Sequence, residues 1–288
     1  MNYKKWLAKN TQSLKGKTVA ISGSTGGIGK ELCRFFCSLS ASLILIDRSK
    51  ERSDALKKAL LAEFPNALLK AYYLDLEDIS ATRELAAALQ GESIDYLVLN
   101  AGAYKIPRRK GENGFENAFN INFVSPYILA DALLPNIKLR GGKVVAVGSI
   151  AHNYSKIDES DVDFATRSAQ SKIYGNAKRY LMYSLWSLEE YRDNINIAHP
   201  GIAVTNITSH YPKVIYAIIK YPMKIIFMSP KKACLSILRA MFTNTKKNEW
   251  IGPRIFDVWG LPKKRILKTC SQEEAEKISE LAKEIYLK

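Results

Sequence analysis

The chain has 288 residues, 47% of them hydrophobic and 25% charged, so it is long enough for one large domain and too apolar to be disordered. No stretch approaches the roughly 18 uncharged apolar residues of a membrane span, and the basic first residues lack the apolar core of a secretory signal. The net charge of +15 is spread along the chain without a nucleic-acid-binding motif, so we expect no nucleic-acid partner.

A glycine-rich turn follows the first predicted strand. Residues 1–16 are a polar lead-in segment, and the β-branched strand at 18–22 runs into the turn GSTGGIG at 23–29 and then into a helix. This order presents free backbone N–H groups and the positive end of a helix to a pyrophosphate. The glycine spacing differs from the G-x-G-x-x-G of two-domain dehydrogenases. The turn nevertheless predicts a dinucleotide site, because it follows a strand.

The second strand, 42–47, ends in a carboxylate. Asp47 at this place can accept hydrogen bonds from an adenosine ribose and repels a 2′-phosphate, which favours NAD(H). Arg48 could instead pair with that phosphate, so NADP(H) stays open. Asp47 could also cap the helix that begins near Lys50, and the two roles are compatible.

Strands and helices alternate over the next hundred residues. This alternation predicts an α/β fold, a single Rossmann-type doubly wound parallel sheet of about seven strands with helices on both faces, in one domain over 1–288. Ligands of such sheets bind beyond the carboxyl ends of the strands. Four glycine or polar positions fall at strand exits, which favours a common site there: Gly23, Asp47, Asp75 and Asn100.

Further polar residues follow in the second half. A helix from about 113 to 136 carries Asn122 in an apolar run, where its amide must be satisfied, by a neighbouring loop or by a functional partner. A fifth strand ends at Ser149. Tyr174 and Lys178 are four apart, which puts both on one face of a helix. An ammonium about 4 Å away favours the phenolate by roughly three pKa units, enough for acid/base catalysis.

The order of these elements resembles the short-chain dehydrogenase/reductase family over roughly residues 16–252. The spacing of Tyr174 and Lys178 alone is common, but the family's motifs occur here in the family's sequence. The Ser149–Tyr174 gap, Ser-Ile-Ala-His152 and the segment 199–205 resemble the retinol dehydrogenase-like branch. The motifs are the turn at 23–29, Asp75-Leu76, Asn100-Ala101-Gly102, Asn122, Ser149, Tyr174-x-x-x-Lys178 and Pro200-Gly201.

The resemblance implies a set of roles. Tyr174 would exchange a proton with the substrate oxygen, Lys178 would lower the pKa of Tyr174 and bind the nicotinamide ribose, Ser149 would hold the oxygen, and Asn122 would fix a relay water. The remaining implied contacts are with the cofactor. They are Gly23, Ser24, Thr25, Gly27 and Ile28 at the pyrophosphate, Asp47 and Arg48 at the adenosine ribose, Asp75 and Leu76 at the adenine, Asn100, Ala101 and Gly102 at the riboses, and Pro200, Gly201 and Thr205 at the carboxamide.

The family keeps a variable substrate lid where this chain has residues 205–228. Within it, three lysines lie seven and four residues apart among apolar side chains, and Pro222 must kink any helix. We expect a lid over a lipophilic substrate, or contact of 207–228 with an anionic membrane surface. The helix expected at 271–288 packs on the domain or on a sister subunit, so monomer and homodimer both stay open.

Together these observations predict an NAD(P)-dependent oxidoreductase. It would act on the alcohol/carbonyl pair of a bulky apolar small molecule, in the cytoplasm or peripheral to a membrane. Two alternatives are reduction of a conjugated double bond and a non-catalytic dinucleotide-binding sensor or scaffold. Since the four cysteines and three histidines show no metal-ligand spacing, we expect no metal site.

Overall fold

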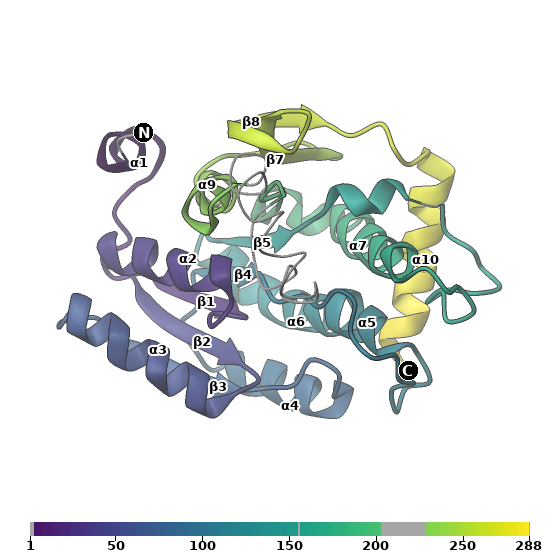
Figure 1. The fold of residues 1–288 in the computed structure, drawn as a ribbon, viewed down its shortest axis with the longest axis horizontal. Coiled ribbons are helices and arrows are strands. Elements are labelled where there is room, and N and C mark those ends of the chain that lie inside the picture. Colours follow the sequence, from purple (N-terminus) through teal and green to yellow (C-terminus); the bar gives the residue numbers. More distant parts are fainter. Residues whose placement is uncertain (1–2, 155, 203–227, 288) are drawn as a thin grey trace, which may run out of the picture.

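A computed structural model describes residues 3–154, 156–202 and 228–287. Its centre is one sheet with the strand order β3-β2-β1-β4-β5-β6-β7-β8 (Figure 1). All neighbouring strands are parallel except β7 and β8, which are antiparallel. The strands are β1 Thr18–Ser22, β2 Ser42–Asp47, β3 Leu69–Tyr73, β4 Tyr96–Leu99, β5 Lys143–Val147, β6 Ile195–Ala198, β7 Glu249–Ile255 and β8 Trp259–Ile266.

Helices cover both faces of the sheet. The apolar side chains of α2, α3 and α9 pack on one face, and those of α4, α6 and α7 pack on the other, with α10 against α7 (Figure 1). The helices are α1 Tyr3–Asn10, α2 Gly27–Ser38, α3 Lys50–Glu63, α4 Ile79–Leu89, α5 Asn117–Phe119, α6 Ser125–Leu139, α7 Gln170–Trp186, α9 Pro230–Met241 and α10 Gln272–Leu287, with a π-helical turn η1 Asn120–Val124 and 3₁₀ turns η2 Ile150–Asn153 and η3 Glu189–Asn194.

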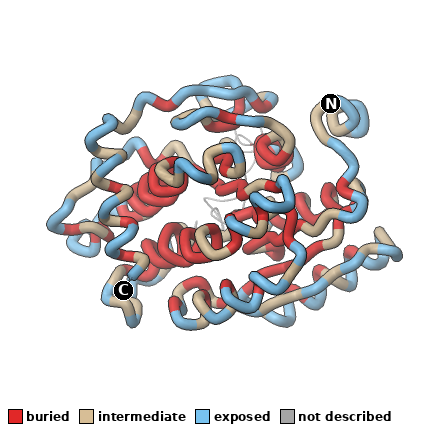
Figure 2. Tube along the Cα trace, turned by 180° about the vertical axis from the view of Figure 1, so that it is seen from behind, coloured by how far each residue is buried: buried red, intermediate tan, exposed pale blue. Residues whose placement is uncertain are grey.

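The central strands are apolar on both sides because each side chain meets a helical layer. In β5, Val144 and Ala146 belong to the core under α6 and α7, while Val145 and Val147 belong to the core under α2 and α9. This follows from the alternation of side chains along a strand, and it explains why the strands lack a polar face. Figure 2 shows the resulting band of buried residues between the outer layers.

The predicted fold is confirmed, with two differences. The sheet has eight strands instead of about seven, because β8 was not expected: it holds Pro262 and three consecutive basic residues, which are tolerated only at a sheet edge. The helix expected at 113–136 consists of α5, η1 and α6.

Some expectations lie outside the described residues. They are the proposed lid at 205–227, its membrane contact and Thr205; Met228, the last lid residue, is described and buried. Across the described ranges, none of the helices combines the length and apolarity that crossing a bilayer requires.

Candidate active site

The exits of β1 and β4 hold each other in place. Asn100 donates from Nδ2 to the carbonyl oxygens of Gly23 at 3.0 Å and Ser22 at 3.2 Å. The Ser22 hydroxyl in turn accepts from the backbone N–H of Ala101 at 3.1 Å. The segment after β4 therefore fixes the glycine-rich turn after β1, and two of the predicted cofactor segments lie side by side.

The glycine-rich turn fits an anionic group. Gly23 has φ +68°, and a Cβ there would lie 2.9 Å from the Cα of Ala101, so only glycine is accommodated. The helix α2 begins at Gly27, and its N-cap, Gly26, supplies no side-chain cap. Uncapped N–H groups at the positive end of a helix bind phosphate oxygens well, so the residues present fit a dinucleotide pyrophosphate.

The carboxylate of Asp47 accepts hydrogen bonds from groups of the protein itself. Its side chain is buried, and its Oδ1 accepts from the backbone N–H of Thr25 at 3.0 Å and from the Thr25 hydroxyl at 3.2 Å. Its Oδ2 accepts from the hydroxyls of Ser24 at 2.5 Å and Ser53 at 3.1 Å. These bonds lend no support to a ribose-binding Asp47. The N-cap of α3 is Ser49, which accepts from the N–H of Arg52, and not Asp47 as the sequence suggested.

A basic group does face the open side of this region. Arg48 is exposed, and its Nη1 lies 3.9 Å from Oδ2 of Asp75, which is half-buried. Arg52 donates from Nη2 to the carbonyl of Thr25 at 3.2 Å. Arg48 and Asp75 thus lie together at the exits of β2 and β3, as expected, while Leu76 is buried and its carbonyl accepts from Ser125.

Asn122 lies in the π-helical turn η1 and is fully buried. Its amide nitrogen donates to the carbonyls of Ala118 at 2.7 Å and Ala103 at 2.9 Å, and its Oδ1 accepts from the N–H of Ala103 at 3.2 Å. The side chain therefore clamps the segment after β4 onto the helix, which is the loop-binding alternative that the sequence left open. A π-helical turn interrupts the regular hydrogen bonding of a helix, and such turns are frequent at functional sites.

Ser149 and Tyr174 meet beyond the exit of β5. Burial raises the pKa of Tyr174 to about 12; its hydrogen bond with Ser149 lowers that pKa, and the neighbouring Tyr104 and Tyr154 raise it. The phenol therefore keeps its proton at neutral pH in this state of the protein. The low pKa expected for Tyr174 is not found here.

Lys178 is buried directly beside this pair. Its Nζ lies 5.8 Å from the centroid of the Tyr174 ring and donates to the carbonyl of Val147 at 3.0 Å. Burial lowers the pKa of Lys178 to about 8. Burial of the phenol is the largest cause of its high pKa.

Two further tyrosines lie near Tyr174 and were not predicted. The ring of Tyr104 meets that of Tyr174 edge to face, with centroids 5.3 Å apart. Tyr154 lies close enough to influence the same hydroxyl, and its side chain is exposed. Tyr104 directly follows the Asn-Ala-Gly-Ala segment, and Tyr154 follows η2, so their closeness to predicted motifs was the signal available in the sequence.

A buried polar chain connects the Ser149 turn with α10. His152 contacts the carbonyl of Ser149 through Nδ1 at 2.6 Å and the hydroxyl of Thr269 through Nε2 at 2.8 Å. Burial lowers the pKa of His152 to about 4. The ring is therefore neutral at pH 7, and because a carbonyl can only accept, its proton resides on Nδ1.

Arg179 completes this chain from the helix of Tyr174. It is almost fully buried and donates to the carboxylate of Glu274 at 2.6 and 2.9 Å, and to the carbonyls of His152 at 2.9 Å and Thr269 at 2.6 Å. Burial opposes ionisation of Glu274, but the hydrogen bonds from Arg179 and from the N–H of Ile157 hold its pKa below the usual value. A paired, bidentate geometry of this kind makes a buried charge tolerable.

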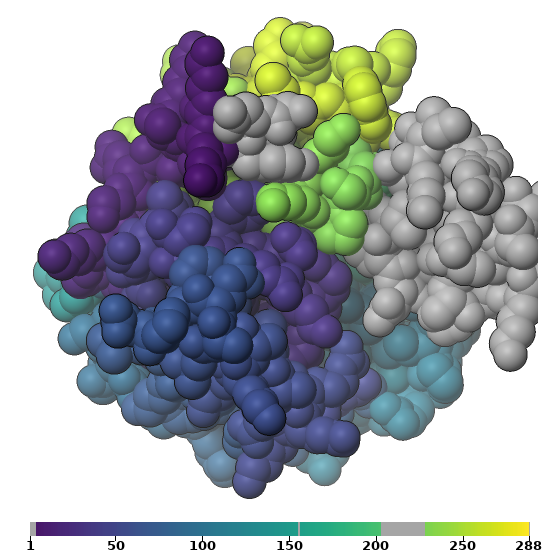
Figure 3. Space-filling view, turned by 60° about the vertical axis from the view of Figure 1, so that its left-hand side comes forward, coloured from purple at the N-terminus to yellow at the C-terminus, as the bar shows by residue number. Residues whose placement is uncertain are grey.

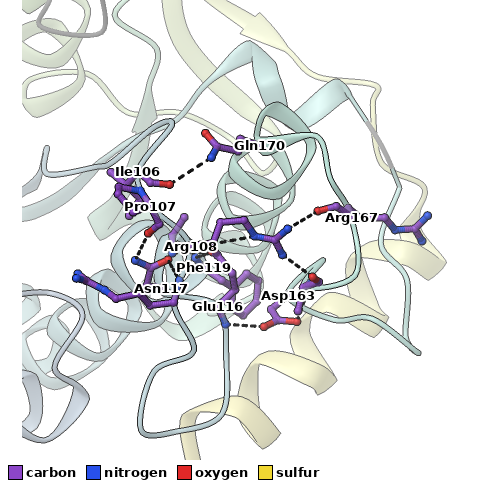
Figure 4. A network of polar contacts seen from close by, with 12 residues as sticks. Ile106, Pro107, Arg108, Glu116, Asn117, Phe119, Asp163, Arg167 and Gln170 are labelled. Atoms are coloured by element: carbon purple, nitrogen blue, oxygen red, sulfur yellow. Dashed lines mark hydrogen bonds and ion pairs between the residues drawn. The ribbon is translucent and has the colours of Figure 1, made fainter. Parts of the chain in front are cut away.

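A second polar network surrounds the start of α5 (Figure 4). Arg108 donates to the carbonyls of Arg167 and Ala165, and the N–H of Glu116 donates to Asp163 at 2.6 Å. The Glu116 carboxylate caps α5 by accepting from the N–H groups of its first turn. These bonds join the segment before α5 to the segment before α7, the helix that carries Tyr174.

The exit of β6 lies against the β7–β8 turn. Pro200 and Gly201 follow β6, and Gly201 has φ +79°. A Cβ on Gly201 would lie 2.7 Å from the carbonyl oxygen of Val258, so the two segments are in close contact. Among the residues that the structure describes, no three acidic, histidine or cysteine side chains gather as metal ligands.

Comparison with known proteins identifies the family. The family model described as short chain dehydrogenase matches residues 17–160, half of the chain. The chain belongs to the short-chain dehydrogenase/reductase family. The description of this model names dehydrogenases, so the family is one of oxidoreductases.

The relatives place it near the retinol dehydrogenase-like branch. It is 30% identical to human retinol dehydrogenase 13 over 206 residues, 69% of this chain and 62% of that protein, and thus matches about six tenths of that relative's length. It is 27% identical to mouse polyprenol dehydrogenase over 240 residues, covering 78% of this chain and 71% of that protein. An uncharacterized protein from Mycobacterium paratuberculosis has the same fold, with a TM-score of 0.75, 22% identity and 97% coverage of both chains.

Proposed function

We propose that this short-chain dehydrogenase/reductase interconverts an alcohol and a carbonyl, with Tyr174 as the acid/base. The observation that carries the proposal is the hydrogen bond between Ser149 and Tyr174 with the buried ammonium of Lys178 beside them, at the edge where the strands end. A purely structural tyrosine would not need a buried lysine beside it, since burying the cation costs free energy.

Each residue has a distinct task in this proposal. Ser149 donates to the substrate oxygen and holds it near the Tyr174 hydroxyl, which gives or takes the proton. Lys178 supplies positive charge that stabilises the phenolate and the developing oxyanion, and Asn122 fixes the segment after β4 against η1. When bound along Gly23–Gly29 and Asn100–Gly102, the nicotinamide dinucleotide supplies or accepts the hydride.

Carbonyl reduction requires a protonated Tyr174, which is the form that the free protein holds at pH 7. A phenol with a pKa of about 12 is a proton donor at pH 7. Tyr104 and Tyr154 offer aromatic surface beside it, which suits a bulky, apolar carbonyl compound. The similarity to proteins named for retinol and polyprenol supports the same substrate class.

The first test replaces the proposed acid. We expect Tyr174→Phe to reduce turnover to below about 10% of the wild type, since positioned acid catalysis contributes at least a hundredfold. Turnover is followed by nicotinamide absorbance against a panel of retinoids, polyprenals, steroids and aliphatic ketones. Cofactor affinity, measured by fluorescence titration, stays near the wild-type value.

Tyr154→Phe is the matched control, because it removes a hydroxyl beside the same site that has no proposed role in proton transfer. It retains wild-type turnover. Tyr174→Phe activity that equals that of the control overturns the assignment.

For the cofactor we propose a preference for NADP(H). The carboxylate of Asp47 is turned toward Ser24, Thr25 and Ser53 and is not offered to a ribose, whereas Arg48 is exposed and in reach of the adenosine side. A guanidinium binds phosphate with charge-assisted hydrogen bonds.

Arg48→Ala tests this preference. We expect its KM for NADPH to rise by about tenfold, the value of one charge-assisted contact, while its KM for NADH changes less than about twofold. NADH thus serves as the internal control. Equal changes for both cofactors would refute a 2′-phosphate contact.

A further inference from the structure

The segment 254–268, here termed the arm, comprises the end of β7, the turn and β8. It forms the edge of the sheet next to α9 (Figure 1) and the yellow surface at the top of Figure 3. Among the described residues, eleven large apolar side chains are exposed, and five of them lie within the arm, so these exposed side chains are concentrated rather than scattered. They are Ile255, Phe256, Trp259, Leu261 and Ile266.

The same segment is strongly basic. It has five cationic residues and one acid, Asp257, which is paired with Arg265. The cationic residues are Arg254, Lys263, Lys264, Arg265 and Lys268, all exposed. Lysines and Pro262 on an edge strand protect a sheet against pairing with other sheets. That explanation does not account for the exposed aromatic and aliphatic side chains between them.

The turn of the arm carries the most exposed of these five apolar side chains. Phe256 is 85% exposed and has φ +49°, and Asp257 after it has φ +56°. Turns of this kind favour asparagine or glycine, and a bulky residue with positive φ is strained. Neither packing nor backbone conformation therefore explains a phenylalanine at this position.

We propose that the arm docks on an anionic bilayer surface. Alternating basic and large apolar side chains with an aromatic ring at the tip are suited to the headgroup region, where cations contact lipid phosphates and rings enter the acyl boundary. Lys232, at the start of α9, adds a cation 5.4 Å from the Trp259 ring. The occupant is thus a negatively charged membrane, and not a hydrophobic protein groove, which would leave the cations unpaired.

The arm contacts the segment that follows β6. Val258, in the turn of the arm, contacts Gly201, which follows the carboxyl end of β6. Ser149 and Tyr174 also lie at the carboxyl ends of the strands. Docking would hold the carboxyl ends of the strands close to the lipid, so that the site could take up an apolar carbonyl compound from the bilayer. Only this delivery step rests on the proposed function; the docking itself does not.

The experiment measures binding of the full chain to vesicles without any turnover. The test variant is Phe256→Asn/Lys263→Glu/Lys268→Glu, in which asparagine suits the positive φ and neither lysine takes part in an ion pair among the described residues. The matched control, Leu139→Asn/Lys58→Glu/Lys283→Glu, changes charge equally and removes an apolar side chain that is 86% exposed elsewhere. Circular dichroism and cofactor titration verify that both variants fold.

We expect the wild type and the control to sediment with vesicles containing about 30% phosphatidylserine and not with pure phosphatidylcholine. The test variant loses at least tenfold in partition coefficient. Equal loss in the test and control variants would show that only net charge matters, and would overturn the proposal. So would a wild type that fails to bind, or a wild-type dimer in sedimentation velocity that the test variant dissociates, since the arm would then contact a second copy.

Discussion

Lys178 is the residue whose environment most constrains the chemistry. It is a buried ammonium that donates to a main-chain carbonyl, and no carboxylate of the described residues pairs with it. Burial favours its neutral form, which is why its pKa falls to about 8. The residue is charged below that pH and loses its charge above it, within the range in which enzymes are assayed.

This gives a pH dependence for the reductive direction. We expect kcat/KM for carbonyl reduction to be constant between about pH 6 and 7 and to fall as pH rises through about 8, because Lys178 then loses the proton that stabilises the oxyanion. The measurement is a pH–rate profile with saturating reduced cofactor. Lys178→Arg, whose guanidinium does not deprotonate, serves as the comparison: residual activity should lack the falling limb. A limb at the same pH in both proteins would contradict the assignment.

At the same scale, Asp47 shows where sequence reasoning reaches its limit. Its place at the end of β2 was correctly predicted, but its direction was not, because two hydroxyls and an N–H of the preceding turn compete for the same carboxylate. A pattern of residue types gives the position of a side chain along a strand. The partners that orient it come from segments such as Ser53, which only the folded chain brings near.

The decisive element is α7, because one helix carries Tyr174, Lys178 and Arg179. Its second turn passes so close to η2 that a Cβ on Gly175 would lie 2.2 Å from the carbonyl oxygen of Ala151. This close approach brings Ser149, which caps η2, within hydrogen-bonding distance of Tyr174. Gly175, between two residues of the predicted motif, is therefore part of the geometry of the site.

Gly175→Ala tests the packing of these two elements. We expect a loss of about 1–3 kcal/mol in the free energy of unfolding, together with at least a tenfold decrease in kcat, since the helix must move away from η2. Thermal unfolding and turnover assays give the two values. Gly91→Ala is the control, because a Cβ there meets its nearest neighbour at an ordinary 3.6 Å. Wild-type stability and kcat in Gly175→Ala would contradict this account.

Two elements could not be predicted from the sequence, for different reasons. β8 has no apolar alternation, because it lies at an edge where only β7 is its partner. The π-helical turn η1 was read as continuous helix, because the apolar residues around Asn122 satisfy a helical pattern regardless of the extra residue in one turn.

At the scale of the whole molecule, the parallel sheet and its two helical layers were predictable, because seven strands carry a local signal and parallel pairing leaves little choice of topology. The candidate catalytic residues and the glycine-rich turn could be named from the sequence. The two polar networks that brace them could not, because they join segments such as 108 and 165 that are distant in sequence. Long-range polar pairing has no periodicity by which it could be recognised.

One consequence concerns the chain end. Glu274 lies fourteen positions before the end of the sequence, yet its carboxylate holds Arg179, which supports the carbonyl of His152 and thereby the turn of Ser149. The helix α10 thus supports the turn of the candidate active site, although it lies on the outside of the molecule. Shortening the protein to the region that resembles its relatives would remove this support, so catalytic domains of this kind should not be trimmed at the last shared motif.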